Sequence, residues 1–275
     1  MTMPIRVALS GSGFRLGAHL GALQAIVDAG FEVIEVAGTS GGSIVAALFA
    51  SGMRLDVLTH MCMTLNWSPM MSFSPWALIA KQSYSTGNAL LQFLQKLTDG
   101  KTFEDLEIDL KVIASDLLTE KEYVFSRATT PAAPIALAAR ASASIPIVFA
   151  PVAYKNVLCV DGGCADNVPA DALTVDSVPR IGIYLESDDS PLRPGKYGLK
   201  TLAPRIIDLL LASNELSHIE LDTNQGATIV HVQTGYASSL DRNMPTAIRQ
   251  RLFNDGYAAT KEALNGVATG HAFKV

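Results

Sequence analysis

Charged residues are scarce in this sequence. Asp, Glu, Lys and Arg make up 17% of the 275 residues, against roughly 25% in an average globular protein. Acidic residues outnumber basic ones by 26 to 21, which gives a net charge of −5, and no basic cluster stands out. A nucleic-acid partner is therefore not expected. Because 49% of the residues are hydrophobic, the chain can form a large core, which excludes a disordered or coiled-coil protein.

Cysteine is also rare, and its spacing forms no motif. The three cysteines, Cys62, Cys159 and Cys164, include no CxxC pair. A disulfide scaffold and a zinc knuckle are therefore not expected, and the histidines show no metal-ligand spacing either. We expect neither a metal nor an organic cofactor.

A signal peptide and a membrane-spanning helix are two further features that the sequence lacks. The first residues, Met1 to Pro4, show no charged start followed by an apolar core. The apolar run from 135 to 153 contains Arg140 and two prolines, which argues against a spanning helix. We therefore expect a cytoplasmic protein whose membrane contact, if it has one, is peripheral. No pattern in the sequence fixes an oligomeric state.

Short β-branched runs alternate with helical patterns along the whole chain. Strands are predicted at 5–9, 33–37, 111–114, 123–125, 157–160, 181–185 and 229–232. Helices are predicted at 16–29, 44–50, 55–64, 88–97, 134–141, 203–223 and 245–264. Strands that alternate with helices favour a three-layer α/β/α fold with a mainly parallel central sheet. Composition does not change across a long loop predicted at 187–198, so residues 1–275 are expected to form a single domain.

The pentapeptide Gly-Thr-Ser-Gly-Gly at 38–42 fits the G-x-S-x-G pattern of a serine nucleophile. In that pattern the serine lies on a sharp turn from strand to helix, where larger flanking side chains would clash. An apolar strand precedes the motif and an apolar helix follows it, and the N-terminus of that helix would stabilise negative charge beside Ser40. We interpret Ser40 as a nucleophile. The alternative is a glycine-rich turn without catalysis.

A second glycine-rich turn, Ser-Gly-Ser-Gly-Phe-Arg at 10–15, closes the first predicted strand. Its backbone N–H groups can bind a phosphate or a developing oxyanion. As a dinucleotide fingerprint the turn fails, because its third glycine is Gly17, one position late, and no acidic residue ends the second strand. Because this loop and Ser40 follow adjacent strands, the pair favours acyl transfer over nucleotide binding.

An aspartate ends a later predicted strand. Asp161 precedes Gly162 and Gly163, which places a carboxylate on a tight turn. Asp-Gly is common in plain turns, so this motif alone leaves both interpretations open. The stretch Ala-Ser-Ala-Ser-Ile-Pro at 141–146 and the pattern Asp-Asn-x-Pro at 166–169 favour a functional role.

Together these motifs resemble the patatin-like phospholipase family. Its members carry a glycine-rich oxyanion loop, a G-x-S-x-G serine and a distal D-G-G or D-G-A aspartate in this order. The resemblance extends from residue 7 to about residue 185 and includes the segments 102–106 and 114–117. The sequence departs from the family at Ser12 and Leu16, where glycine is commoner. The resemblance implies a patatin-like fold and a serine lipid acyl hydrolase of the phospholipase A type, acting on phospholipids or related acyl esters.

The same resemblance implies a role for each motif residue. Ser40 corresponds to the nucleophile, and Asp161 corresponds to the base of a Ser–Asp dyad. The implied oxyanion loop consists of Gly11, Ser12 and Gly13, with Arg15 supporting it. The elbow and turn glycines that accompany these roles are Gly38, Gly41, Gly42, Gly162 and Gly163.

Other functions fit parts of the sequence. The order Ser40, Asp161 and a later histidine satisfies a conventional triad, although that fold builds several strands before its serine. The histidines late enough in the chain for this role are His218, His231 and His271, whereas His19 and His60 are expected to be packed or superficial. An acyltransferase on the same scaffold, a non-enzymatic Rossmann-type nucleotide-binding protein and a regulatory module without catalysis are the further alternatives.

One segment is unusually apolar. Val57 to Ala80 contains no Asp, Glu, Lys or Arg, yet it holds both tryptophans, Trp67 and Trp76, and four of the eight methionines. Prolines within it prevent one continuous helix. One interpretation is ordinary core packing beneath a long loop. The other is an apolar rim over Ser40, which predicts peripheral membrane contact through the segment from Trp67 to Trp76.

Overall fold

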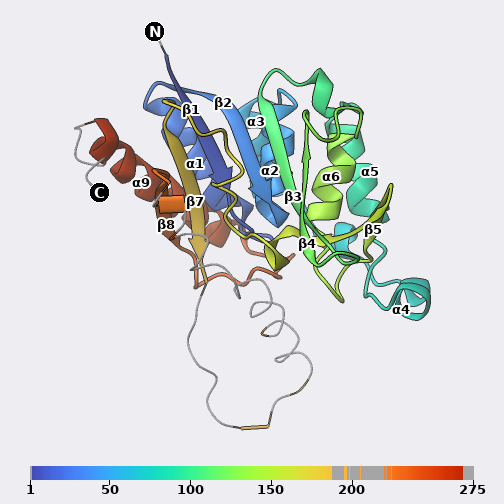
Figure 1. Cartoon of the computed structure of the whole chain (residues 1–275). Helices are drawn as coiled ribbons and strands as arrows, with labels where there is room; N and C mark the ends of the chain where they lie inside the picture. Colours follow the sequence, from blue (N-terminus) through green and yellow to red (C-terminus); the bar gives the residue numbers. More distant parts are fainter. Residues whose placement is uncertain are drawn as a thin grey trace.

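The protein is built on a mixed eight-stranded sheet (Figure 1). Its computed structural model describes residues 2–187 and 225–268, with a few residues between 195 and 223, and the side chains of the last helix to residue 265. The strand order is β5-β6-β3-β2-β1-β7-β8, and β4 pairs with β3 outside this path. The strands are β1 (Met3–Leu9), β2 (Phe31–Thr39), β3 (Asp109–Asp116), β4 (Lys121–Ser126), β5 (Val152–Tyr154), β6 (Val157–Asp161), β7 (Arg180–Glu186) and β8 (Thr228–Gln233).

Helices cover one face of the sheet. Figure 1 shows α1, α2 and α6 behind the strands, where α2 contacts both α1 and α6, and α9 packs on α1. The helices are α1 (Leu16–Asp28), α2 (Ser40–Ala50), α3 (Leu55–Thr64), α4 (Pro75–Lys81), α5 (Asn88–Leu97), α6 (Ile135–Ser142) and α9 (Thr246–Ala268), with short 3₁₀ turns η1 (Ser68–Met71), η2 (Phe103–Asp105) and η3 (Gly162–Cys164). Within the described ranges, no helix is both long and apolar enough to cross a membrane.

The predicted α/β class is confirmed, and every predicted strand is present. The sheet is parallel across β3-β2-β1-β7-β8 and antiparallel where β3, β4, β5 and β6 pair. One strand, β5, and one α-helix, α4, were not predicted. β5 has three residues next to a proline, and α4 has seven residues that begin at Pro75, with the Ser74 hydroxyl accepting from the Ala77 N–H. The helix predicted at 203–223 and most of the loop predicted at 187–198 lie outside the described residues.

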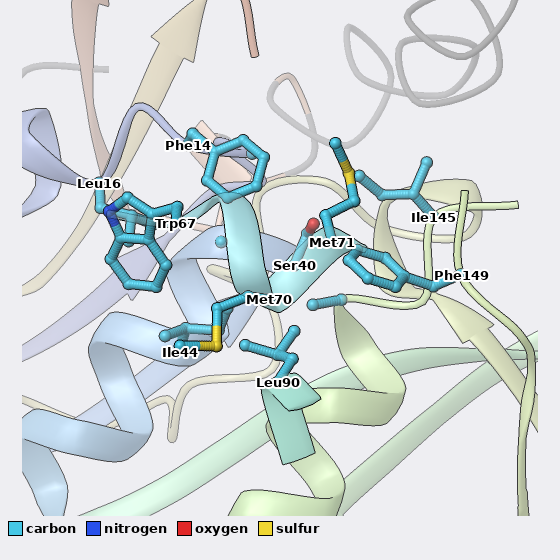
Figure 2. Close-up of a pocket in the computed structure, with 13 residues that line it drawn as sticks. Phe14, Leu16, Ser40, Ile44, Trp67, Met70, Met71, Leu90, Ile145 and Phe149 are labelled. Carbon is cyan, nitrogen blue, oxygen red and sulfur yellow. The ribbon is translucent and has the colours of Figure 1, made fainter. Parts of the chain in front are cut away.

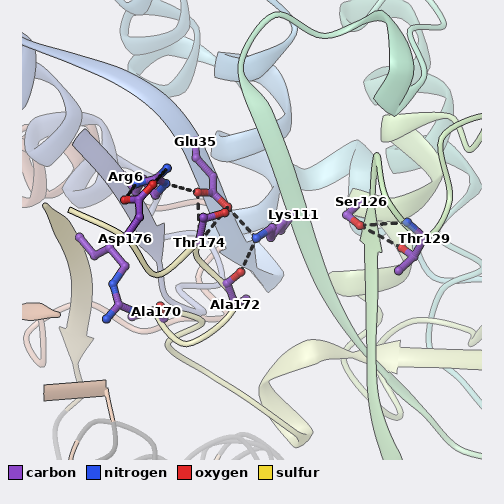
Figure 3. A network of polar contacts seen from close by, with 10 residues as sticks. Arg6, Glu35, Lys111, Ser126, Thr129, Ala170, Ala172, Thr174 and Asp176 are labelled. Carbon is purple, nitrogen blue, oxygen red and sulfur yellow. Dashed lines mark hydrogen bonds and ion pairs between the residues drawn. The ribbon is translucent and has the colours of Figure 1, made fainter. Parts of the chain in front are cut away.

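The other face of the sheet carries a polar network beneath the segment between β6 and β7 (Figure 3). Glu35 on β2 lies 2.5 Å from Arg6 Nε of β1 and 2.6 Å from Lys111 Nζ of β3. The Thr174 N–H donates to the same carboxylate at 3.1 Å. Ala8, two residues after Arg6, is on the same face because strand side chains alternate, and it packs with Leu173 of the covering segment. This network therefore ties the segment that follows Asp161 to three neighbouring strands.

The strand pairing on β3 brings distant parts of the chain together. β4 pairs with residues 111–116 of β3 and so occupies one edge of that strand. On the other edge β2 ends with Thr39 opposite Ile113, and β6 ends with Asp161 opposite Ala114. The ends of β2 and β6 therefore meet on neighbouring residues of β3. This meeting places Ser40, the first residue after β2, beside Asp161, 121 residues later in the sequence.

Candidate active site

Ser40 occupies a sharp elbow between β2 and α2. Its φ angle is +50°, in the left-handed region that costs a non-glycine residue energy. The flanking glycines are required by close backbone approaches. A Cβ atom would lie 2.3 Å from the Leu9 carbonyl oxygen if placed on Gly42, and 2.4 Å from the Gly13 carbonyl oxygen if placed on Gly41. On Gly38 it would lie 2.7 Å from Ser43 Cα. The elbow thus presses directly against the loop that follows β1.

The Ser40 hydroxyl donates a hydrogen bond to Asp161. Its Oγ lies 2.7 Å from Asp161 Oδ2, and both side chains are buried. The second carboxylate oxygen accepts from the Gly163 N–H at 2.9 Å. Gly162 between them allows a tight turn, because a Cβ on it would lie 2.3 Å from the Ile113 carbonyl oxygen. Both glycines after the aspartate therefore help to hold its carboxylate toward Ser40.

Burial changes the chemistry of Asp161. Its side chain has no exposed surface, and this desolvation raises the pKa of the carboxyl from 3.8 to about 7, although the hydrogen bonds from Ser40 and Gly163 oppose the rise. A carboxylate with a pKa near neutrality is a much stronger base than one in water. Ser40 therefore has a partner able to accept its proton near pH 7.

The glycine-rich loop is held by two residues from distant segments. The Gly11 N–H donates to the main-chain oxygen of Asn167 at 3.0 Å and to its Oδ1 at 3.1 Å. The Phe14 N–H donates to the Ser239 carbonyl at 2.8 Å. Gly13 has a φ of +54°, and a Cβ on it would lie 2.1 Å from the Ser239 oxygen. Loop closure at this point requires glycine.

These bonds distinguish the N–H groups of the loop. The Gly11 N–H is already occupied by Asn167. Within the described part of the chain, the N–H groups of Ser12 and Gly13 donate to no protein acceptor. Gly13 borders the same pocket as Ser40. Of the three predicted donors, Gly13 therefore combines an N–H group without a protein acceptor among the described residues with a place in the lining of the pocket.

Arg15 supports this loop through hydrogen bonds of its side chain. It is buried, its Nε donates to the Ser12 carbonyl at 3.2 Å, and one terminal nitrogen donates to the hydroxyl of Thr234 at 2.8 Å. The same nitrogen lies 3.2 Å from the Ser187 hydroxyl. Arg15 thus joins the loop to the ends of β7 and β8.

An apolar pocket opens beside Ser40 (Figure 2). It encloses about 470 Å³ of space, part of it open to solvent. The Ser40 hydroxyl is the only side-chain oxygen among the described residues that line it, which are Gly13, Phe14, Leu16, Ser40, Gly41, Ile44, Trp67, Met70, Met71, Leu90, Ala143, Ile145 and Phe149. Such a lining suits a hydrocarbon chain better than a charged or heavily hydroxylated group.

Sequence reasoning missed several residues that hold the site. The Ser40 N–H donates to Ser142 Oγ at 2.8 Å, and the Asp161 N–H donates to the Ser144 carbonyl at 3.0 Å. Both serines belong to the Ala-Ser-Ala-Ser-Ile-Pro stretch at the end of α6. The motif was visible in the sequence, but only the structure shows that it accepts hydrogen bonds from the backbone N–H groups of both Ser40 and Asp161.

Arg140 is a second residue of this kind. Its guanidinium is buried, donates to the carbonyls of Gly87, Thr86 and Ala150 at 2.9–3.1 Å, and lies 5.0 Å from the centre of the Phe149 ring. No carboxylate in the described ranges pairs with it, and burial lowers its pKa to about 10. Arg140 therefore joins the start of α5 to the pocket wall.

The described histidines lie apart from the dyad. His19 is buried with Nε2 2.8 Å from the Ser10 carbonyl oxygen, and burial lowers its pKa to about 3. His231 on β8 pairs with Glu186 at 2.7 Å, and His60 is exposed on α3. None of these three contacts Ser40 or Asp161 through a hydrogen bond. His218 and His271 lie outside the described residues.

The two tryptophans of the uncharged segment have different surroundings. Trp67 is 3% exposed and packs between Phe14 and Phe93, with ring centres 6.1 and 6.0 Å away. Trp76 on α4 is 60% exposed. The segment is thus divided into a pocket wall around Trp67 and an exposed part around Trp76.

Comparison with known proteins places this geometry in context. The family model described as patatin-like phospholipase matches residues 7–174. An uncharacterized protein of Acanthamoeba polyphaga mimivirus is 27% identical over 276 residues, covering 94% of this chain and 93% of that protein. An uncharacterized NTE family protein of Mycobacterium tuberculosis is 30% identical over 165 residues, covering 60% of this chain but only 44% of the longer relative.

Solved structures show the same fold. VipD from Legionella pneumophila superposes with a TM-score of 0.63 at 16% identity, covering 96% of this chain and 67% of that chain. The type III effector protein ExoU superposes with a TM-score of 0.57 at 14% identity, covering 99% of this chain and 54% of that chain.

Proposed function

The chain belongs to the patatin-like phospholipase family, and on that premise we propose that it hydrolyses acyl esters of phospholipids or related lipids. Ser40 is the nucleophile and Asp161 is its base. The observation that carries this proposal is the 2.7 Å hydrogen bond from the Ser40 hydroxyl to a wholly buried carboxylate. Ser40 lines an apolar pocket, in which an acyl chain would place its carbonyl carbon beside the Ser40 hydroxyl.

The first half of the reaction forms an acyl-enzyme. Ser40 Oγ attacks the ester carbonyl carbon while its proton passes to Asp161 Oδ2. The carbonyl oxygen becomes an oxyanion, and the N–H groups of Ser12 and Gly13 stabilise it. When the tetrahedral intermediate collapses, the C–O bond to the alcohol breaks, and Asp161 returns the proton to the leaving oxygen.

The second half releases the fatty acid. Water attacks the acyl carbon of the Ser40 ester, and Asp161 accepts a proton from that water. The same two N–H groups stabilise the second oxyanion. Collapse of this intermediate breaks the bond to Ser40 Oγ, which recovers its proton from Asp161. An alcohol in place of water would give acyl transfer instead.

The pocket lining supports a lipid substrate. Its walls provide hydrocarbon and aromatic surface and no charged side chain among the described residues. Burying each methylene of an acyl chain there contributes about 0.8 kcal/mol. Because such substrates reside in membranes, peripheral contact with lipid through the segment from Trp67 to Trp76 belongs to this proposal.

A lipid assay tests the proposal. Purified protein is incubated with vesicles of mixed phospholipids, and the products are identified by mass spectrometry, with Ser40→Ala as the control. We expect free fatty acid and lysophospholipid from the unaltered protein alone. If folded protein releases no fatty acid from any phospholipid or neutral acyl ester, the proposal is wrong.

A further inference from the structure

An exposed apolar surface surrounds α4. Six large apolar side chains there are 39–83% exposed, with Ile79 the most exposed at 83%, and we call them the α4 surface: Phe73, Trp76, Leu78, Ile79, Tyr84 and Ile147. Figure 1 shows α4 standing away from the body of the molecule. Only Ala77 of this helix is buried. Isolated apolar side chains are normal on a surface, but a cluster of this kind marks a site of interaction.

The α4 surface is joined to the pocket wall by backbone hydrogen bonds. The Tyr84 N–H donates to the Ile147 carbonyl at 2.7 Å, and the Ser85 N–H donates to the Val148 carbonyl at 2.9 Å. Ile147 lies between Ile145 and Phe149, both of which line the pocket. On the other side, Met71 lines the pocket two residues before Phe73. Residues of the α4 surface therefore lie within two positions of pocket-lining residues in two separate stretches of the chain.

The charged residues of the chain segment that contains α4 are of one sign. From Val57 to Thr98 the only charged side chains are Lys81 and Lys96, although the whole chain has a net charge of −5. Lys81 Nζ lies 5.8 Å from the centre of the Trp76 ring. Exposed Trp and Tyr beside a flexible cation suit the headgroup level of a membrane, and anionic lipids attract such cations.

We propose that the α4 surface docks on a phospholipid bilayer that contains anionic lipid, so that an acyl chain can pass from the bilayer into the pocket along apolar side chains. The passage of an acyl chain from the bilayer into the pocket rests on the proposed function, whereas the docking of the α4 surface on the bilayer does not. A stable dimer would need a complementary face of about 800 Å² on each copy. A projecting helix of two turns instead suits insertion into a fluid interface.

Vesicle binding by the catalytically silent Ser40→Ala protein tests the docking. The vesicles contain phosphatidylcholine, with or without phosphatidylglycerol. Trp67 is buried and keeps a constant emission, so a shift of the fluorescence to the blue reports on Trp76. We expect that shift and stronger binding to the anionic vesicles. Adding Ile79→Glu should weaken binding at least about tenfold, because an apolar side chain that would be buried in the bilayer is replaced by a charge.

Val175→Glu is the matched control. Val175 is 63% exposed and lies between Thr174 and Asp176, which bind the network around Glu35. We expect its vesicle affinity to stay within about twofold, as for an ordinary surface substitution. Equal binding by the Ile79→Glu and Val175→Glu proteins would overturn the proposal. So would a dimer that Ile79→Glu converts to a monomer, because a second copy would then cover the α4 surface.

Activity separates this proposal from the proposed function. With Ser40 intact, the Ile79→Glu protein should hydrolyse a soluble short-chain nitrophenyl ester at the unaltered rate and lose hydrolysis of vesicle phospholipid. If no variant cleaves the soluble ester while vesicle binding behaves as expected, the esterase function fails and the docking stands. If Ile79→Glu abolishes cleavage of the soluble ester, Ile79 acts on the pocket and the docking role is contradicted.

Discussion

At the scale of single residues, Asp161 combines burial with the proton-accepting role that we propose for it. The surroundings that make it an adequate base also withhold water from its charge. Its carboxylate is oriented by Gly163 and receives the Ser40 hydroxyl. No third side chain is needed to orient this base, because the turn after β6 supplies the second hydrogen bond.

Replacing either member of the dyad should abolish turnover. We expect Ser40→Ala and Asp161→Asn each to lower kcat for a soluble ester by at least about 10³, and the double variant to lose little more than either single one, because the two groups act as a unit. Circular dichroism serves as the folding control. Near-normal turnover by folded Asp161→Asn protein would instead require a base other than Asp161.

The pKa of Asp161 predicts opposite effects of pH on activity and stability. Only the ionised carboxylate accepts the Ser40 proton, so kcat/KM should rise as the pH passes through about 7. The folded-state pKa lies above the unfolded value, so the folded state holds a proton that the unfolded chain releases. Stability from this group is therefore present below about pH 4 and is lost as the pH rises to about 7.

The Asp161→Asn variant tests how the raised pKa of Asp161 affects stability. Its side chain can still bond both Ser40 and Gly163, because the amide nitrogen can donate to the serine oxygen and the amide oxygen can accept from the glycine. We expect this variant to melt at a higher temperature than the unaltered protein at pH 8, by the equivalent of a few kcal/mol, and to lose the advantage at pH 4. A difference in Tm that does not change with pH would contradict the raised pKa.

Gly13 should tolerate no side chain. In Gly13→Ala the new Cβ would lie 2.1 Å from the Ser239 oxygen. The loop must therefore move, and its N–H groups would no longer point toward the oxyanion. We expect kcat to fall by about 10² to 10³ with a smaller change in KM. Gly30→Ala is the control, because Gly30 also has a positive φ of +83° but nothing within 4 Å of a new Cβ. A loss of kcat in both proteins would point to general backbone strain and not to the oxyanion loop.

At the scale of elements, the sequence predicted the strands and the turn that carry the site, but it did not predict how these elements come together in space. β-branched runs located β2 and β6, and G-x-S-x-G located the elbow, because both signals are local. The pairing of β2 and β6 against one edge of β3 depends on contacts between distant residues, which no local pattern contains. The same holds for Asn167 and Ser239, which hold the glycine-rich loop from segments far along the chain.

Arg140 illustrates how elements are joined without a paired charge. Its three carbonyl acceptors come from the start of α5 and from the pocket wall, and a lysine cannot span them all. We expect Arg140→Lys to lower the free energy of unfolding by about 2–3 kcal/mol, measured by denaturant. As a positioning residue it should also raise KM for long-chain esters more than for short ones, because Phe149 loses its support. Equal KM changes for both ester lengths would reduce its role to stability.

At the scale of the whole molecule, the uncharged segment from Val57 to Ala80 contributes both to the wall of the pocket and to the exposed surface. Composition alone could not separate Trp67 from Trp76, because both lie among apolar residues and prolines. Packing separates them: Trp67 fits between Phe14 and Phe93, whereas the short helix α4 has only Ala77 to bury. The polar network around Glu35 is also separate from the site, because Glu35 lies within β2 whereas Ser40 and Asp161 lie at the ends of β2 and β6.

Covalent labelling tests the central claim most directly. A fluorophosphonate reacts with a serine that is activated as a nucleophile, and mass spectrometry of the digested protein locates the adduct. We predict a single adduct on Ser40, none in the Ser40→Ala protein, and labelling slowed at least about 10³-fold in Asp161→Asn. Folded protein that leaves Ser40 unlabelled, or labels it equally fast in Asp161→Asn, would contradict the account of a Ser40–Asp161 dyad.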